Sequence, residues 1–208
     1  FASLGPTLAD EVGKDMQHPS VAFEKDVATL GSFSLVPFDL DCDVRVIHPW
    51  VNMEYASFWM LGNSSEADVR AEYTKILSTG HTEVLMGYHK DKPVFLVEVY
   101  DPGHEEIGTH IDPAAGDYGM HVLVGPPDEH IPNFTSGVFY LIMSFLFEAR
   151  QAKRVFVEPD IGNAKIHKLN RRFGFRVLQE RVQLANKTAQ LELCLREDFE
   201  RCSKVLGF

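Results

Sequence analysis

Runs of apolar residues in the middle of the chain predict three β-strands, at 83–89, 94–100 and 119–124. The polar segment KDKP at 90–93 joins the first two, as is typical of a hairpin. The segment GPP at 125–127 ends the third strand, because proline cannot donate to a sheet ladder. Further runs predict a strand at 154–158 and a final antiparallel hairpin from 175–184 and 188–195. The alternation from 33 to 50 predicts a strand pair.

Apolar residues at helical spacing predict helices between these strands. Ser65 and Asp68 predict a capping box at the start of a helix that Gly80 ends. The segment 138–146 is apolar nearly all round, which predicts a helix that lies deep against a sheet. Segments 53–61, 163–173 and 198–205 are also predicted as helices. We interpret residues 1–32 as an N-terminal extension of loop and short helix, and 33–208 as one α/β domain with a mixed sheet.

The composition is that of an ordinary globular chain of 208 residues, 45% hydrophobic and 24% charged, which suits one domain. No apolar run is long enough to predict a membrane span, and the start lacks the pattern of a secretory signal. Cys42, Cys194 and Cys202 are odd in number and lack CxxC spacing, which favours a reducing cytoplasm. The chain does not begin with methionine, which leaves open whether it is part of a larger multidomain protein.

Charge is unevenly distributed along the chain. Twenty Lys and Arg against thirty Asp and Glu give a net charge of −10, which argues against a nucleic-acid surface. Residues 150–182 nevertheless hold nine basic and three acidic residues. Such a window indicates either an anionic ligand or two solvated helix faces, and charge alone does not choose between them.

The start of the apolar helix suggests an anion site. Small and polar residues here allow a phosphate to approach the free N–H groups of a first helical turn. Anion binding at a helix start is common, so this pattern names no ligand by itself. The residues concerned are Asn133, Phe134, Thr135, Ser136 and Gly137.

The helix at 163–173 carries a more specific pattern. Asn163, Ile166, Leu169 and Asn170, followed by Gly174-Phe175, match the spacing N-x-x-[AI]-x-x-L-x-x-x-x-G-F. With the order of elements over 33–196, this resembles the GNAT family of acyl-CoA-dependent N-acyltransferases. The resemblance implies the GNAT fold, an α/β (α+β) architecture whose mixed, mostly antiparallel central sheet has helices on both faces. An amphipathic helix with a glycine C-cap is the alternative interpretation.

Two differences from the usual GNAT motifs, and several short sequence segments, narrow the resemblance to one branch of the family. The family's phosphate loop [QR]-x-x-G-x-[GA] is absent, and Asn170 stands where many members have a general-acid tyrosine. The phrases HPWV at 48–51, FLVEVYDP at 95–102, GDYGMH at 116–121 and VEPDIGN at 157–163 resemble the branch that acylates hydroxylamines or lysine in hydroxamate siderophore biosynthesis. Acyltransferases of desferrioxamine, alcaligin and aerobactin pathways are the most similar, and the mycobactin lysine acyltransferase is more distant.

In that branch a His and an Asp form the catalytic pair, and the matching positions here are His121 and Asp160. An N-hydroxyamine is mostly neutral near pH 7, so a nearby imidazole suits it as a weak base, with a carboxylate to steady the imidazolium. Without the resemblance, His121 is better interpreted as a core histidine and Asp160 as a turn residue after Pro159.

The resemblance also implies two sets of binding residues. Backbone N–H groups of the third strand would polarise the thioester, and basic residues would reach the phosphates of coenzyme A. The expected coenzyme-binding residues are Val122, Leu123, Val124, Asn133, Phe134, Thr135, Ser136, Gly137, Asn163, Lys165, Asn170 and Arg171. The expected acceptor-binding residues are His48, Trp50, Tyr55, Trp59, Glu98, Tyr100 and Asp117. The alternative interpretation is that the aromatic residues pack in the core and the acidic ones are solvated.

The resemblance therefore implies an enzyme that transfers a succinyl or acetyl group from succinyl-CoA or acetyl-CoA to an N-hydroxylated diamine. N6-hydroxylysine or lysine is an alternative acceptor, and ordinary amines or protein N-termini are a further one. A non-catalytic acyl-CoA-binding domain of a siderophore synthetase is an alternative of another class. The implied partners are a small acceptor and a synthetase, fused or separate, with no nucleic acid and no membrane. Acidic and histidine residues at 104–112 lack a ligand spacing, so no metal is expected.

Overall fold

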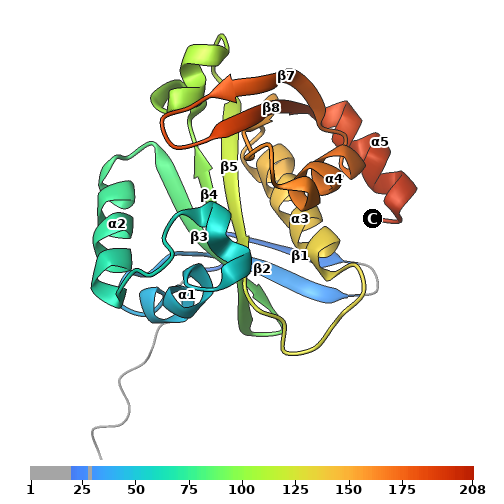
Figure 1. Cartoon of the computed structure of the whole chain (residues 1–208). Coiled ribbons are helices and arrows are strands. Elements are labelled where there is room, and N and C mark those ends of the chain that lie inside the picture. Colours follow the sequence, from blue (N-terminus) through green and yellow to red (C-terminus); the bar gives the residue numbers. More distant parts are fainter. Residues whose placement is uncertain (1–19, 28–29) are drawn as a thin grey trace, which may run out of the picture.

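The computed structural model describes residues 20–27 and 30–208 (Figure 1). One eight-stranded sheet organises them, in the order β1-β2-β3-β4-β5-β6-β8-β7. The strands are β1 (Phe23–Val27), β2 (Gly31–Pro37), β3 (Thr82–His89), β4 (Lys92–Tyr100), β5 (Asp117–Val124), β6 (Arg154–Val157), β7 (Arg176–Gln183) and β8 (Thr188–Leu195). The longer helices are α1 (Val44–Val51), α2 (Glu66–Ser78), α3 (Phe134–Ser144), α4 (Ala164–Arg172) and α5 (Arg196–Leu206).

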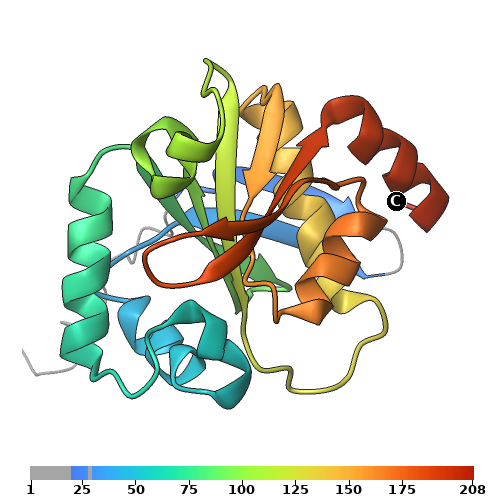
Figure 2. The ribbon, with the colours of Figure 1, turned by 45° about the horizontal axis from the view of Figure 1, so that its top comes forward.

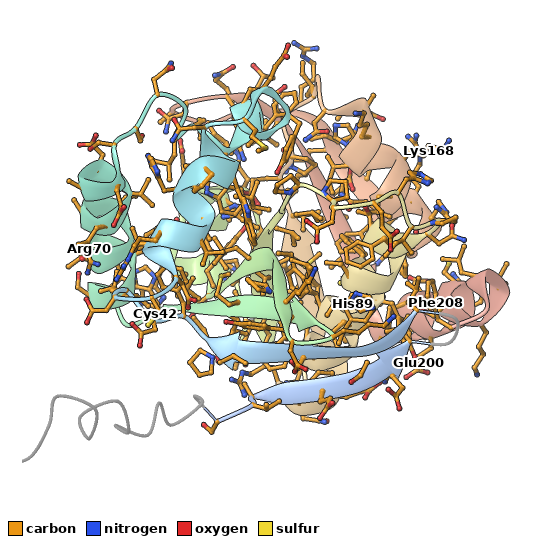
Figure 3. The ribbon with its side chains drawn as sticks, turned by 90° about the horizontal axis from the view of Figure 1, so that it is seen from below. Cys42, Arg70, His89, Lys168, Glu200 and Phe208 are labelled. Carbon is orange, nitrogen blue, oxygen red and sulfur yellow. The ribbon has the colours of Figure 1, made fainter. Side chains whose placement is uncertain are left out.

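Short helical segments complete the chain: η1 (Glu54–Trp59), η2 (Pro102–His104), η3 (Glu106–His110) and the π-helical η4 (Phe145–Ala149) that continues α3. All neighbouring strands pair antiparallel except β5 and β6, which pair parallel. The expected mixed, mostly antiparallel sheet is therefore confirmed. Figure 1 shows α2 and α3 on opposite sides of the central strands, and Figure 3, seen from below, shows Arg70 of α2 and Lys168 of α4 at opposite sides of the molecule.

The central strands are buried on both faces, which explains their nearly continuous apolar runs. Along β4, Val97 and Val99 pack in the cluster that contains α3, whereas Leu96 packs in the cluster that contains α1 and α2. Because side chains alternate across a strand, Glu98 and Tyr100 lie on the same face as Leu96. The apolar helix α3 is buried along nearly its whole length, as predicted.

The parallel pairing of β5 with β6 is short, and this shapes the site. It joins residues 117–119 of β5 to residues 154–156 of β6. Beyond Gly119 the strand β5 continues to Val124, and among the described residues β6 does not pair with it there. The two strands therefore part at the middle of the sheet, where the sequence predicts that the catalytic groups meet.

Most predicted elements are observed, and the capping box of Ser65 and Asp68 is present at the start of α2. The strand pair predicted over 33–50 is wrong in its second half, because α1 occupies Val44–Val51. Val44, Ile47 and Val51 are fully buried there at helical spacing, so helical burial prevailed over the local alternation. The predicted helix at 53–61 is a 3₁₀-helix, η1.

The expectation of loop and short helix near the start is wrong for β1, which pairs with β2 along its length. The rest of that expectation, over residues 1–19, lies outside the described residues. Among those that are described, no helix is long and apolar enough to cross a membrane.

Candidate active site

Strand periodicity and register bring four polar side chains to one face of the sheet. Glu98 lies opposite His121 in the pairing of β4 with β5, and Tyr100 lies opposite Gly119. Glu158 follows β6 directly and lies two positions after Phe156, so it shares the face of Phe156. Their side chains meet where β5 and β6 part.

His121 lies between two carboxylates. Its Nδ1 is 3.1 Å from Oε2 of Glu98, and its Nε2 is 2.7 Å from Oε1 of Glu158. Both glutamate side chains are largely buried, whereas 38% of the His121 side chain is exposed. The histidine is therefore held rigidly but stays open to a ligand in the space beside it.

Tyrosines and a lysine support these carboxylates from other elements. The Tyr100 hydroxyl donates to Oε2 of Glu158 at 2.6 Å, and the Tyr73 hydroxyl, from α2, donates to Oε1 of Glu98 at 3.0 Å. Lys187, in the β7–β8 turn, places its Nζ 3.4 Å from Oε1 of Glu158. Each carboxylate thus accepts hydrogen bonds on both of its oxygens.

Glycine at position 119 makes room for this arrangement. A Cβ atom on Gly119 would lie 2.0 Å from Cε2 of Tyr100, so the tyrosine ring occupies the space that any other side chain would fill. The ring of Tyr100 also lies 4.8 Å from that of His121. Gly119 therefore sets the position of the hydroxyl that donates to Glu158.

The close charges shift the pKa values of the central pair in opposite directions. Burial lowers the pKa of His121, but Glu158 and Glu98 outweigh this effect and raise it to about 10. Burial raises the pKa of Glu158, but His121, Lys187 and Tyr100 outweigh it and lower that pKa to about 2. The site therefore holds an imidazolium between two carboxylates at neutral pH, where the sequence predicts a weak base.

A cleft of about 460 Å³ opens beside this network. One wall comes from η1 and α2, the floor from β5 and the parting β6, and the other walls from α4, η3 and the β7–β8 turn. The turn of that hairpin is fixed to η3, because the Ala185 N–H donates to the Glu106 carboxylate at 2.9 Å. Figure 2 shows the hairpin extending from the α4 and α5 side toward this region.

The fold agrees with a comparison of the sequence to known protein families. The sequence family described as "Acetyltransferase (GNAT) domain" matches residues 39–183, well over half of the chain. The chain belongs to the GNAT family. This confirms the family that the motifs indicate and identifies the chain as an acyl-CoA-dependent N-acyltransferase.

Two curated relatives act on hydroxylated amines, according to their names. An "N-hydroxyputrescine acetyltransferase" of Acinetobacter baumannii is 25% identical over 169 residues, which cover 81% of this chain and 80% of the relative. An "N(6)-hydroxylysine O-acetyltransferase" of Escherichia coli is 26% identical over 157 residues, covering 72% of this chain. The match spans only 48%, about half, of that second relative.

Solved structures share the fold. An uncharacterized protein from Bacillus halodurans superposes with a TM-score of 0.81 at 23% identity and covers 88% of this chain and 94% of that one. The structure of AAC(6')-Ib in complex with ribostamycin and coenzyme A has a TM-score of 0.70 at 17% identity, covering 81% and 96% of the two chains. These likenesses support the GNAT fold and nothing finer.

The expected catalytic pair is only half assembled. His121 occupies the centre, but its two ring nitrogens face Glu98 and Glu158, and among the described residues no hydrogen bond joins it to Asp160. Oδ1 of Asp160 accepts from the N–H of Gly162, as in a turn, although the residue still lines the cleft. Glu158 and Glu98 therefore take the place beside His121 that the sequence assigns to Asp160.

The expected acceptor residues fall into two groups. Tyr55, Trp59, Glu98 and Tyr100 line the cleft, and Trp59 donates to the Tyr73 hydroxyl at 3.2 Å. Three others are not among the residues that line the cleft. His48 bonds the Ser64 carbonyl, Trp50 is buried beside Gly125, and Asp117 is paired with Arg154.

The expected coenzyme residues also divide. Val122, Leu123, Val124, Asn163 and Asn170 line the cleft. Asn133 precedes α3, and Phe134, Thr135, Ser136 and Gly137 form its first turn. Lys165 and Arg171 are not among the cleft-lining residues. Arg171 lines a separate cavity of about 480 Å³ that also includes Arg181.

Asn170 has a fixed orientation in the cleft. Its Nδ2 donates to Oε2 of buried Glu192 at 2.8 Å, and Oε1 of Glu192 lies 2.6 Å from Nδ1 of His167. Among the described residues, Oδ1 of Asn170 is buried without a hydrogen-bond partner. Because Nδ2 is held by Glu192, Oδ1 remains a buried acceptor that no donor satisfies among the described residues.

Sequence reasoning missed Glu158 and Lys187 as site residues, whereas Arg172 was expected, with Lys165 and Arg171, to reach the coenzyme phosphates. Arg172 donates to the Ser136 hydroxyl at 3.3 Å, so its guanidinium lies at the start of α3, whereas Lys168 of the same helix points into solvent (Figure 3). For Glu158, the two-residue period from Phe156 was a usable signal. Within the described residues, no group of three or more His, Cys, Asp or Glu side chains could hold a metal ion.

Proposed function

We propose that this GNAT enzyme transfers the acetyl group of acetyl-CoA to the hydroxylamine nitrogen of an N-hydroxylated diamine such as N-hydroxyputrescine or N-hydroxycadaverine. The product is a hydroxamate, a building block for siderophore biosynthesis. The relative named N-hydroxyputrescine acetyltransferase, which aligns over most of both chains, supports this acceptor class.

The observation that carries the acceptor assignment is the charge of the cleft. Six carboxylates line it, whereas Lys187 is the one lysine or arginine among the described residues that does so. A diamine brings a distal ammonium, which an acidic wall attracts, while N6-hydroxylysine also brings a carboxylate that this wall repels. The carboxylates belong to Glu72, Glu98, Glu105, Glu106, Glu158 and Asp160.

The donor assignment follows from the same charges. The succinyl group ends in a carboxylate that would enter a cleft where Lys187 is already paired with Glu158. An acetyl group carries no charge and avoids this repulsion. Both curated relatives are named acetyltransferases, which also supports acetyl-CoA as donor.

We assign the phosphates of coenzyme A to the start of α3. The first turn of a helix offers N–H groups without intrahelical partners and the positive end of the helix dipole. The guanidinium of Arg172 adds a fixed positive charge beside Ser136. The thioester arm then follows the part of β5 beyond Gly119, where β6 no longer pairs and backbone groups of Val122 and Val124 can polarise the carbonyl.

The test measures release of free thiol from acetyl-CoA and succinyl-CoA with four acceptors: N-hydroxyputrescine, N-hydroxycadaverine, putrescine and N6-hydroxylysine. We expect thiol release with acetyl-CoA and the two N-hydroxylated diamines, together with a hydroxamate product. His121→Asn removes the central imidazolium and should lower the rate by about a hundredfold or more. His104→Asn is the matched control, since His104 lies on η2 with 59% of its side chain exposed.

Absence of thiol release with every N-hydroxylamine would refute the proposed reaction. Faster turnover of N6-hydroxylysine than of the diamines would refute the charge argument for the acceptor. A preference for succinyl-CoA would refute the donor assignment while leaving the reaction class intact.

A further inference from the structure

We infer that this site acylates only nitrogen nucleophiles that reach it uncharged, because His121 is a doubly protonated imidazolium clamped between Glu98 and Glu158 and cannot act as a base. The inference rests on the proposed function and deepens it. It defines the substrate class by protonation state: N-hydroxyamines and other weakly basic amines are acylated, and alkylammonium ions are not.

The hydrogen-bond directions around Glu98 indicate the protonation state of Nδ1 of His121. The Trp59 indole N–H can only donate, so the Tyr73 oxygen accepts from it and the Tyr73 proton points to Oε1 of Glu98. Oε2 of Glu98 then faces Nδ1 of His121 at 3.1 Å. An ionised carboxylate only accepts, and therefore Nδ1 carries a proton.

The hydrogen-bond directions around Glu158 indicate the protonation state of Nε2 of His121. Its Oε2 accepts from the Tyr100 hydroxyl, and its Oε1 faces both the Lys187 ammonium and Nε2 of His121. With an ammonium donating to the same oxygen, Glu158 stays ionised, and Nε2 of His121 carries a proton as well. The raised pKa of His121 and the lowered pKa of Glu158 agree with this assignment.

Every charged or titratable group that packs around His121 favours the same state. Glu98 and Tyr100 face it from β4, Glu158 from the end of β6, and Tyr73 and Lys187 act through the two carboxylates. Burial and the neighbouring glutamates raise the pKa of both tyrosines well above 10, so they stay neutral donors. Glu105 of the neighbouring loop adds to this effect on Tyr100. Two carboxylates, one imidazolium and one ammonium leave this group of charges balanced.

This balance has a chemical consequence for the acceptor. An alkylamine with a pKa of about 10.4 is neutral in only about one molecule in 2,500 at pH 7. No group in the clamp can take its proton, since His121 is already protonated and the pKa of Glu158 is far too low. An N-hydroxyamine is mostly neutral at this pH and needs no deprotonation before it attacks.

The transfer step balances without a base on the protein. The neutral nitrogen attacks the thioester carbonyl, so a C–N bond forms and the C–S bond breaks. The proton of the attacking nitrogen, which is strongly acidic once the bond forms, passes to the departing thiolate, which leaves as the free thiol of coenzyme A. His121 keeps both protons and stabilises negative charge in the transition state.

The decisive comparison is the pH dependence of kcat/KM for N-hydroxyputrescine and putrescine with acetyl-CoA between about pH 6.5 and pH 9. We expect a nearly flat profile for N-hydroxyputrescine. For putrescine we expect a rate lower by about three orders of magnitude at pH 7, which rises about tenfold per pH unit. A putrescine rate within about tenfold of that of N-hydroxyputrescine at pH 7, or a putrescine profile that levels off near pH 6.5, would overturn the inference.

A second measurement does not depend on turnover and separates this inference from the proposed function. NMR of isotope-labelled histidine, assigned with His121→Asn, reports the protonation of both ring nitrogens during a pH titration. We expect His121 to stay doubly protonated to about pH 9, and titration near its ordinary value of 6.5 would overturn the inference. Glu98→Gln should lower its pKa, whereas Glu24→Gln on β1 should leave it unchanged. If no acceptor is turned over, the proposed function fails, and this titration still decides the state of His121.

Lys187 provides an internal control, because its primary amine lies in the same cleft, 3.4 Å from Oε1 of Glu158. If the site contained a free base, this amine would itself be acetylated. We expect intact-mass measurements after prolonged incubation with acetyl-CoA to show Lys187 unmodified. Acetylation that Lys187→Met abolishes and Lys204→Met on α5 does not abolish would contradict the inference.

Discussion

Two glycines on neighbouring strand pairs offer a sharp test of how the site is positioned. A Cβ on Gly119 would lie 2.0 Å from Tyr100, and a Cβ on Gly87 would lie 2.0 Å from Phe95. In both cases the aromatic residue lies on β4 and the glycine lies directly opposite it, on β3 or on β5. The steric perturbation is therefore nearly the same. Of the two aromatic residues, Tyr100 donates to Glu158, whereas Phe95 is fully buried in the core.

Replacing either glycine with alanine should destabilise the fold by a similar amount. Forcing an extra methyl group into a packed interior costs about 1–3 kcal/mol, since the ring must shift or leave its rotamer. Gly119→Ala should in addition displace the Tyr100 hydroxyl from Glu158. A hydrogen bond to a charged group contributes about 1.5–3 kcal/mol, which corresponds to a loss of about 10- to 150-fold in kcat/KM if the bond acts in the transition state.

The assay combines urea unfolding of both variants with kcat/KM for acetyl transfer to N-hydroxyputrescine, measured where each variant is fully folded. Tyr100→Phe should reproduce the catalytic loss of Gly119→Ala without its steric cost. We expect Gly87→Ala to keep nearly the full activity of the wild type. Equal activity loss in both glycine variants, or full activity in Gly119→Ala, would refute the idea that Gly119 positions the hydroxyl.

Four further outcomes follow from the site. The pKa of His121 is raised on folding, so its contribution to stability is complete below pH 6.5 and is lost as the pH rises toward 10. Chemical denaturation should therefore show that the difference in the free energy of unfolding between wild type and His121→Asn shrinks over this range. Glu158, with a lowered pKa, contributes above pH 4.5 and loses its contribution toward pH 2. Arg172→Met should raise the KM for acetyl-CoA by about tenfold or more with little change in kcat, while Lys168→Met on the same helix should change neither. Tyr73→Phe should lower the free energy of unfolding by about 1–3 kcal/mol, measured in urea, because a buried carboxylate oxygen loses its donor.

Local pattern explains how much of the fold was predictable. Strands β3, β4, β5 and β8 and helices α2 and α4 follow from apolar spacing, turn residues and caps, which act between residues close in sequence. The prediction is wrong at α1, where alternation over a few residues competes with helical burial. It is also wrong at β1, whose sequence FEKDV has three consecutive charged residues and so lacks an apolar alternation. These elements depend on the surfaces against which they pack.

The family and the strand that carries His121 follow from the sequence alone, because motif spacing and strand period are local properties. The tertiary structure decided which groups surround the histidine. Glu98 and Glu158 lie 23 and 37 residues away from it, and they arrive only through the register of β4 and the parallel pairing of β6. For that reason the sequence favours Asp160 and a neutral imidazole, whereas the folded chain surrounds His121 with two glutamates. The charge of an imidazole depends on its neighbours in space and on its burial, and neither is written in the local sequence.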